Sequence, residues 1–408
     1  MQLAYGSTGL QSRNRTRYLL IHRSTGWPST AASLYESYLS ARFPSPNTVR
    51  GALESLGYMY SWGEEFKVDI DSLLLDGEGL SDSQVRHFAH WLRTRSIEEN
   101  FTAQNIKGTT YNRILYYCED TTRWFRSQFT NLGKTPNARR LAVDRLNRMR
   151  HTVWRDARQR LPHFQIAPDL SEDEIKTIES YLLPSNRIKT GTQPDVACRD
   201  YLIWRLAIEF GLRKGEILAL RLQDCPNHKS NYIRIVRIEE RGKDYFDPRG
   251  KHAPRPKTLS RDLGYLLSNS PIPKLISTYR SKYRRVWPTD VKLKSEHPFA
   301  LDHDFLFVGR RSGEPMSAST MQDLAERIAG DTRISFHWHL TRHALFNRAY
   351  AAVSLEKDNQ AQIMDLVYFG GWRDPSSLEI YSRRATRDRA RVILKHWQDK
   401  GNIWPALS

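Results

Sequence analysis

The chain carries its most informative stretch near the C-terminal end: Gly370-Gly371-Trp372-Arg373-Asp374-Pro375-Ser376-Ser377-Leu378-Glu379-Ile380-Tyr381. Asp374 followed by Pro375 is typical of a helix start, with an N-cap residue and then proline at the first helical position. We therefore expect a short helix over residues 375–382 that carries Tyr381, nine residues after Trp372. The chain has 19 tyrosines, so Tyr381 is a candidate functional residue only because of its spacing from Trp372 and the motifs upstream of it.

The first upstream motif is Gly211-Leu212-Arg213-Lys214-Gly215-Glu216. Gly211 ends an apolar helix, so Arg213 lies at a helix junction from which a guanidinium can reach an anion. Glu216 can hydrogen-bond to Arg213 and orient it. An ordinary surface pair of these two residues fits the same pattern.

The second upstream motif is His339-Leu340-Thr341-Arg342-His343. His339 and Arg342 are three residues apart, so a helix presents both on one face. Arginine binds phosphate oxygens with a planar fork, and histidine moves protons near neutral pH. A structural pair fits the spacing too, and His337 and His343 flank it, so the sequence leaves open which histidine is active.

The 408 residues carry a net charge of +18, which indicates a polyanionic partner, most often nucleic acid. Nine of the basic residues fall between Lys134 and Arg160, against Asp144 and Asp156. A solvated helix face normally mixes the two signs more evenly. The residues of this segment that we expect to bind DNA are Arg139, Arg140, Arg145, Arg148, Arg155 and Arg158.

The remaining bulk properties are typical of a soluble protein, with 39% hydrophobic and 26% charged residues. No apolar run is long enough for a membrane span or a signal peptide, so we expect a cytoplasmic protein that joins the nucleoid when bound to DNA. Cys118, Cys198 and Cys225 are scattered and lack metal-ligand spacing, which argues against disulfides and a zinc site.

The length exceeds one ordinary core, so we expect two domains. Residues 1–30 lack sustained periodicity and should form an arm or a loosely packed lead-in. Apolar residues recur at helical spacing in four segments of residues 31–160, which predicts a small helical domain. Prolines break residues 161–170 into a linker, and a capping box at Ser171 opens a second domain over residues 171–408.

The second domain is predicted to contain both helices and strands. The fold as a whole is predicted to be mostly α with a small β-sheet. A β-branched run at Tyr232–Ile238 predicts a strand, and residues 241–262 predict a long hairpin or loop. Helices are expected at 171–183, 196–210, 214–224, 271–285, 317–330, 337–352, 358–369, 375–382 and 385–397.

In this order the motifs resemble those of the tyrosine recombinase family, of the phage-integrase type. The resemblance covers about residues 168–395 as the catalytic domain, and residues 31–160 resemble the family's helical core-binding domain in architecture. It implies a C-shaped clamp on double-stranded DNA. The site residues that it assigns are Arg213, Glu216, His339, Arg342, Trp372 and Tyr381.

The family also places a catalytic lysine on a β-hairpin. Lys257, in Pro254-Arg255-Pro256-Lys257-Thr258-Leu259-Ser260-Arg261, resembles the Lys-Thr form of this motif. Lys243 is the alternative and Lys251 a weaker one, because the hairpin is longer than usual. Trp372 stands where the family commonly has a second histidine, which implies packing and an indole N–H donor instead of proton handling.

The resemblance implies a site-specific recombinase, the integrase or transposase of a mobile element, that works through a 3′-phosphotyrosyl intermediate. Tyr381 would be the nucleophile, the two arginines would bind the phosphate, and Lys257 would protonate the leaving oxygen. Such chemistry requires neither ATP nor a metal. The alternatives are a type IB topoisomerase and a non-catalytic DNA-binding regulator.

The resemblance further implies a homo-tetramer on two DNA sites and leaves the need for accessory proteins open. The basic segment after Tyr381 has an apolar face that could dock in a neighbouring subunit or pack on its own domain. The residues of this face are Val392, Ile393, Leu394 and Trp397.

Overall fold

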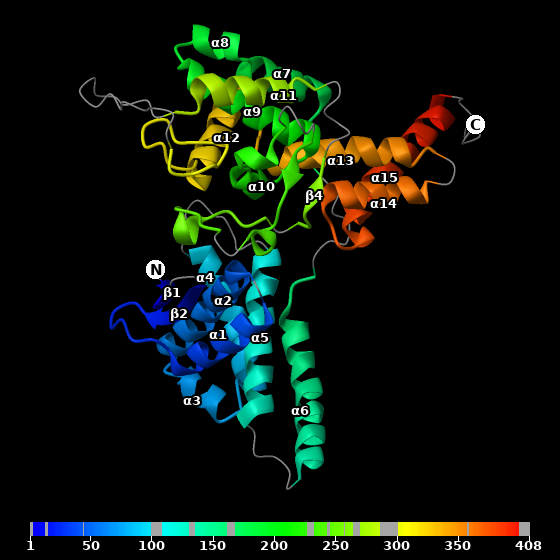
Figure 1. Cartoon of the computed structure of the whole chain (residues 1–408). Coiled ribbons are helices and arrows are strands. Elements are labelled where there is room, and N and C mark those ends of the chain that lie inside the picture. The colour runs from blue at the N-terminus through cyan, green and yellow to red at the C-terminus, as the bar shows by residue number, and fades with distance from the viewer. Residues whose placement is uncertain are drawn as a thin grey trace, which may run out of the picture. The chain divides into compact units, whose positions relative to one another are not determined.

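The computed structural model describes residues 3–12, 15–43, 45–98, 108–129, 135–160, 168–226, 232–242, 245–256, 258–263, 270–285, 301–356 and 359–399. The chain divides into two compact units, residues 1–163 and 164–408, with the division inside the range where the linker is expected. The fold is mostly helical with small sheets, which confirms the predicted class (Figure 1).

The first unit begins with an antiparallel hairpin of β1 (Tyr5–Ser12) and β2 (Arg15–His22), in place of the expected arm or loose lead-in. Tyr18 and Leu20 of β2 are buried in the core of the unit. The apolar alternation of β2 is only a few residues long, which is why periodicity did not reveal the strand.

The helices of the first unit bury the apolar stripes predicted from the sequence. Ile114, Leu115 and Phe125, for example, are fully buried. The helices are α1 (Thr30–Arg42), α2 (Pro46–Glu65), α3 (Ile70–Leu75), α4 (Asp82–Glu98), α5 (Gly108–Phe129) and α6 (Pro136–Ala157).

The helix α6 covers most of the basic segment between Lys134 and Arg160. The hydroxyl of Thr135 accepts from the backbone N–H of Ala138, and Pro136 takes the first turn. Val143 and Trp154 are the buried residues of this helix. Since the apolar content is small, most of its side chains remain on the surface.

The second unit packs its helices around α9, whose Trp204, Leu206 and Phe210 are fully buried. The capping box predicted at Ser171 is present, with Glu174 as its partner. The helices are α7 (Glu172–Leu182), α8 (Pro184–Lys189), α9 (Pro194–Phe210), α10 (Lys214–Ala219), α11 (Ile272–Thr278), α12 (Ala318–Thr332), α13 (His339–Val353), α14 (Gln360–Gly370) and α15 (Glu379–Asp399).

The sheet of the second unit is shorter than predicted. β3 (Arg234–Ile235) pairs antiparallel with β4 (Arg261–Asp262), and a 3-10 turn at Ile238–Glu240 ends the strand. The intervening segment is held mainly by side chains. Arg249, for example, pairs with Asp247 at 2.9 Å and donates to the backbone carbonyls of Leu218 and Met316, both at 3.0 Å.

The C-terminal region corrects the expectation of two helices over 375–382 and 385–397. Asp374 caps only a 3-10 turn, Pro375–Leu378, by accepting from the backbone N–H of Ser376 at 2.7 Å. Residue 379 then begins one continuous helix, α15, because no Gly or Pro interrupts residues 379–399. Figure 1 shows α15 beside α13 and α14, and these three helices carry most of the site described below.

In the described part of the chain, no helix combines the length and the apolar composition that a bilayer crossing requires.

Candidate active site

Arg342 is the centre of the site and is only 1% exposed. Its Nη1 donates to the carbonyl of Gly211 at 2.9 Å, and its Nη2 donates to the carbonyl of Gly370 at 2.7 Å. These carbonyls lie at the C-terminal ends of α9 and α14, where the negative partial charge of a helix favours a cation. Arg342, from the first turn of α13, therefore ties three helices together.

The two glycines that end α9 and α14 are required by this arrangement. Gly211 and Gly371 have φ of 58° and 64°, in the left-handed region that favours glycine. A Cβ on Gly211 would lie 3.0 Å from the side chain of Leu345, and a Cβ on Gly371 would lie 2.5 Å from Nη1 of Arg261. Both glycines of the sequence motifs thus allow close packing around the arginines.

Tyr381 lies in the first turn of α15 with only 2% of its surface exposed. Its ring centroid is 5.7 Å from those of Phe346 and His343 and 5.9 Å from that of Trp372. Burial raises the pKa of Tyr381, while the charges of Arg342 and Arg213 and a hydrogen bond with Arg342 oppose this rise. The phenol is therefore protonated at neutral pH and must lose its proton before its oxygen can form a bond.

Arg213 precedes α10 and is partly buried. The carboxylate of Glu216 accepts from its backbone N–H at 2.7 Å. The hydrogen bond expected between Glu216 and Arg213 is therefore made to the main chain of Arg213 and not to its side chain. Nη1 of the Arg213 guanidinium has no hydrogen-bonding partner among the described residues. Burial lowers the pKa of Arg213, so a bound anion would restore favourable interactions for this cation.

Arg261 is a member of this cluster that sequence reasoning missed. It pairs with Glu216 at 3.0 Å and donates from Nε to the carbonyl of Phe369 at 2.7 Å. The hydroxyl of Thr258 also donates to Glu216, and the N–H of Leu259 donates to the carbonyl of Gly371 at 2.9 Å. Burial alone would raise the pKa of Glu216, but the charge of Arg261 lowers it, so Glu216 is ionised.

These contacts fix residues 258–261 against the end of α14. Lys257, the favoured proton donor, and Lys243, its alternative, both lie outside the described residues. The weaker alternative, Lys251, belongs to a 3-10 turn at Gly250–His252. The choice among the three lysines therefore stays a prediction.

The two histidines of the second motif and the flanking His337 differ in their exposure to solvent. His337 and His339 are exposed, whereas His343 is buried with 8% of its surface accessible. The rings of His339 and His343 are 4.4 Å apart between centroids. Loss of hydration, followed by nearby positive charge, lowers the pKa of His339 to about 4, and burial lowers that of His343 to about 4.

Trp372 packs on the guanidinium of Arg342, whose Cζ lies 4.5 Å from the centroid of the indole. The same ring lies 4.5 Å from Phe346, between centroids. This position fits the expected packing role in place of a second histidine. Arg213, Glu216, His339, Arg342, Trp372 and Tyr381 thus lie in one cluster of the second unit, linked by the contacts and charge interactions above.

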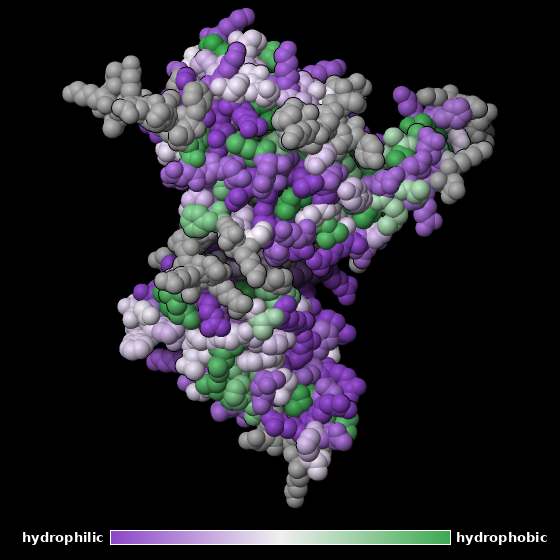
Figure 2. Space-filling model, viewed as in Figure 1, coloured by the Kyte–Doolittle hydropathy of each residue, from purple (hydrophilic) through white to green (hydrophobic). Residues whose placement is uncertain are grey.

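The first unit presents a second candidate site along α6, for contact with DNA. Figure 2 shows hydrophilic side chains over much of this part of the surface, with a few apolar ones among them. Arg140, Arg145, Arg148 and Arg155 are exposed. Arg139 instead donates to the carbonyl of Gln128 at 2.9 Å, and Arg158 donates to Glu119 at 2.5 Å.

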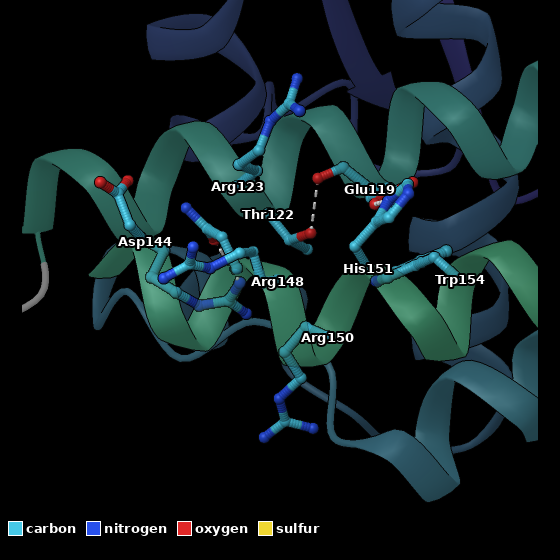
Figure 3. A pocket seen from close by; sticks show the side chains of 10 residues that line it. Glu119, Thr122, Arg123, Asp144, Arg148, Arg150, His151 and Trp154 are labelled. Atoms are coloured by element: carbon cyan, nitrogen blue, oxygen red, sulfur yellow. Dashed lines mark hydrogen bonds and ion pairs between the residues drawn. The ribbon is translucent and has the colours of Figure 1, made fainter. Parts of the chain in front are cut away.

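A pocket between α5 and α6 is lined by Glu119 and Arg123 from α5 and by Arg148 and His151 from α6 (Figure 3). Glu119 lies 2.5 Å from a ring nitrogen of His151. Together with the bond from Arg158, this contact holds α6 on α5. Arg148 also lines the pocket but is exposed and forms no ion pair with the described residues, so it remains suited to an external phosphate.

The chain is similar to known proteins both in sequence and in structure. No protein-family model matches the chain. Transposase A from transposon Tn554 of Staphylococcus aureus is 24% identical over 313 residues, which are 75% of this chain and 75% of that protein.

Among solved structures, the post-cleavage complex of the XerH site-specific recombinase bound to a palindromic difH substrate matches with a TM-score of 0.52 and 12% identity. The match covers 90% of this chain and 85% of that chain. Lambda integrase bound to DNA matches with a TM-score of 0.42 and 13% identity, over 81% of this chain and 89% of that one.

Proposed function

We propose that this chain, which has the fold of the XerH site-specific recombinase, is a tyrosine recombinase that cuts and rejoins double-stranded DNA. The observation that carries the proposal is that the buried Tyr381 lies in the field of two arginines, Arg342 and Arg213. Similarity to a transposase over 75% of the chain supports a role as the transposase or integrase of a mobile element.

Cleavage begins when the hydroxyl oxygen of Tyr381 attacks the scissile phosphorus. A 3′-phosphotyrosyl bond forms, the bond from phosphorus to the 5′-oxygen breaks, and the 5′-oxygen leaves as a hydroxyl. Arg213 and Arg342 stabilise the charge that develops on the non-bridging oxygens. In support, Nη1 of Arg213 and Nε of Arg342 are buried and have no hydrogen-bonding partner among the described residues.

The other site residues handle protons and hold the arginines. Lys257 protonates the leaving 5′-oxygen, with Lys243 as the alternative. His339 acts as a general acid or base near the nucleophile. Glu216, ion-paired with Arg261, holds the start of α10 in place.

Rejoining reverses these steps with a new strand, because the 5′-hydroxyl of a partner strand attacks the phosphotyrosine. The covalent bond conserves the energy of the phosphodiester, so the reaction needs neither ATP nor a metal. The arginines of α6 contribute contacts to the DNA backbone. The protein acts on DNA in the cytoplasm, where accessory proteins could assist it.

Strand exchange between two DNA sites requires a homo-tetramer. The C-terminal part of α15 supports subunit contacts because its apolar face is exposed. The exposed fractions are 70% for Val392, 51% for Ile393, 52% for Leu394 and 53% for Trp397. Docking of this face on a neighbouring subunit would remove it from water.

The test is incubation with a suicide DNA substrate that carries a nick near the cleavage position of the element's ends. Wild-type protein should form a covalent adduct on the peptide that contains Tyr381, and Tyr381→Phe should form none. Tyr368→Phe is the control, because Tyr368 is 57% exposed. An adduct that persists in Tyr381→Phe would overturn the assignment of the nucleophile.

The same substrate separates the two alternative functions. A type IB topoisomerase would form the adduct and relax supercoiled DNA without joining two sites. A non-catalytic regulator would bind DNA and form no adduct at all.

A further inference from the structure

His343 lies next to both Tyr381 and a solvent-exposed histidine, His339. Its ring centroid is 5.7 Å from that of Tyr381 and 4.4 Å from that of His339. His339 and His343 are one helical turn apart on α13, whereas Tyr381 comes from α15. His343 is therefore a ring neighbour of both the buried tyrosine and the exposed His339.

His343 is buried and yet incompletely satisfied. Its Nδ1 has no hydrogen-bonding partner in the described part of the chain. A buried polar atom without a partner is unfavourable, so such atoms in folded proteins call for an explanation. Packing alone would be served by phenylalanine, which has no such cost.

Burial, followed by the charges around it, keeps the ring of His343 neutral at neutral pH. From α13 it faces His339 and Arg342, from α15 it faces Arg384 and Tyr381, and His337 precedes α13. Burial and these neighbours lower the pKa of His343 to about 4. A neutral imidazole has a lone pair that can take a proton.

We propose that His343 is a further catalytic residue, which accepts the proton that Tyr381 loses when it attacks the phosphate. This inference rests on the proposed function. As the bond from the phenolic oxygen to phosphorus forms, the O–H bond of Tyr381 breaks and its proton moves to a ring nitrogen of His343. The exposed His339 then links this proton to solvent.

The rejoining step uses the same residue in reverse. The incoming 5′-hydroxyl attacks phosphorus, the bond from phosphorus to the phenolic oxygen breaks, and Tyr381 recovers a proton from His343. Because the ring starts and ends neutral, one catalytic cycle leaves its protonation unchanged.

The experiment measures single-turnover cleavage of the suicide substrate by full-length protein. His343→Phe, which keeps the aromatic volume, should cleave about 100-fold more slowly with unchanged DNA affinity, since general acid–base residues contribute about 10²–10⁴-fold. His337→Phe is the control, because His337 is exposed, and should remain within about twofold of wild type, as expected for a surface position.

A chemical rescue distinguishes proton transfer from packing. Difluorotyrosine at position 381 ionises at lower pH than tyrosine and so depends less on a general base. In His343→Phe it should raise the cleavage rate about tenfold above that of the same variant with tyrosine, as general-base behaviour predicts. In wild-type protein the same replacement should give no such gain. If His343→Phe melts early, His343→Gln gives the same readout, because glutamine has no ionisable nitrogen.

Two results would overturn the inference. One is a wild-type cleavage rate in the folded His343 variants, and the other is a loss of rate that difluorotyrosine does not relieve. Failure of the proposed function looks different, because wild-type protein would then form no covalent adduct with DNA.

Discussion

Glu216 and Arg261 form an ion pair at 3.0 Å in which neither side chain is exposed to solvent. Removing one partner of such a pair leaves an uncompensated buried charge, so Arg261→Gln should destabilise the second unit by about 3–5 kcal/mol. Urea unfolding followed by tryptophan fluorescence measures this change. The matched control is Arg234→Gln, because Arg234 pairs with Asp262 at the same 3.0 Å with both side chains about half exposed.

For this exposed control the expected cost is about 0–1 kcal/mol. Equal losses in the two variants would mean that burial of the Glu216–Arg261 pair does not strengthen its contribution. In that case Arg261 would not hold residues 258–261 as described above.

The left-handed glycine that follows α14 should tolerate no side chain. In Gly371→Ala the new Cβ would lie 2.5 Å from Nη1 of Arg261, at a φ of 64°. Gly191→Ala is the control, because Gly191 also has a positive φ, 90°, but its Cβ would meet no atom within 4 Å. We expect the control to lose about 1–2 kcal/mol from backbone strain, and Gly371→Ala to lose clearly more in the same urea titration. Similar losses would show that Arg261 moves aside at little cost.

Arg213 and Arg342 should respond differently to replacement, although both bind the phosphate in the proposed reaction. Arg213→Gln should slow cleavage about 10²–10³-fold, as expected for removal of a group that stabilises the transition state. Its stability should change little, because Nη1 of Arg213 bonds to no described residue. Single-turnover cleavage and thermal melting of the same preparations separate the two effects.

Arg342→Gln should lose stability as well as activity, because this side chain donates to the carbonyls of Gly211 and Gly370. A stable but inactive Arg342→Gln would mean that these two bonds do not hold α9 and α14 together.

The depressed pKa values of His339 and His343 predict a loss of stability in mild acid. Each has a folded pKa of about 4 against an ordinary value of 6.5. Between these values the unfolded chain binds more protons than the folded chain, so stability is full above pH 6.5 and falls as the pH drops toward 4. Melting temperatures from pH 4 to 8 should show this decline. A His339→Phe/His343→Phe double variant should show a shallower one, and an unchanged slope would assign the acid sensitivity to other groups.

Local signals in the sequence were enough to predict part of this structure. The capping box at Ser171 depends on residues three positions apart, and a helix was expected over the segment that bears His339 and Arg342. The nine-residue step from Trp372 to Tyr381 also depends only on neighbours along the chain. Features of this kind can be predicted from a single sequence, because they depend only on residues close together along the chain.

The contacts that the sequence did not reveal join distant residues. Arg261 bonds to Glu216, 45 positions away, and to Phe369, 108 positions away, so no local pattern could have marked it. His343 lies on the same helix face as His339, but its contact with Tyr381 depends on the packing of α15 against α13. Arg261 is flanked by Ser260 and Asp262, and His343 directly follows Arg342, so neither residue stood out from its neighbours along the chain.

The six arginines expected to bind DNA should fall into two groups in salt titrations. Arg148 is exposed, so Arg148→Gln should remove one phosphate contact and reduce the slope of log affinity against log salt by about 0.9. Arg158 is already paired with Glu119 at 2.5 Å, so Arg158→Gln should leave the slope nearly unchanged. The measurement is fluorescence anisotropy with labelled duplex DNA at several salt concentrations. Equal slopes for the two variants would show that the Glu119 pair opens when DNA binds, and that Arg158 then contacts a phosphate as well.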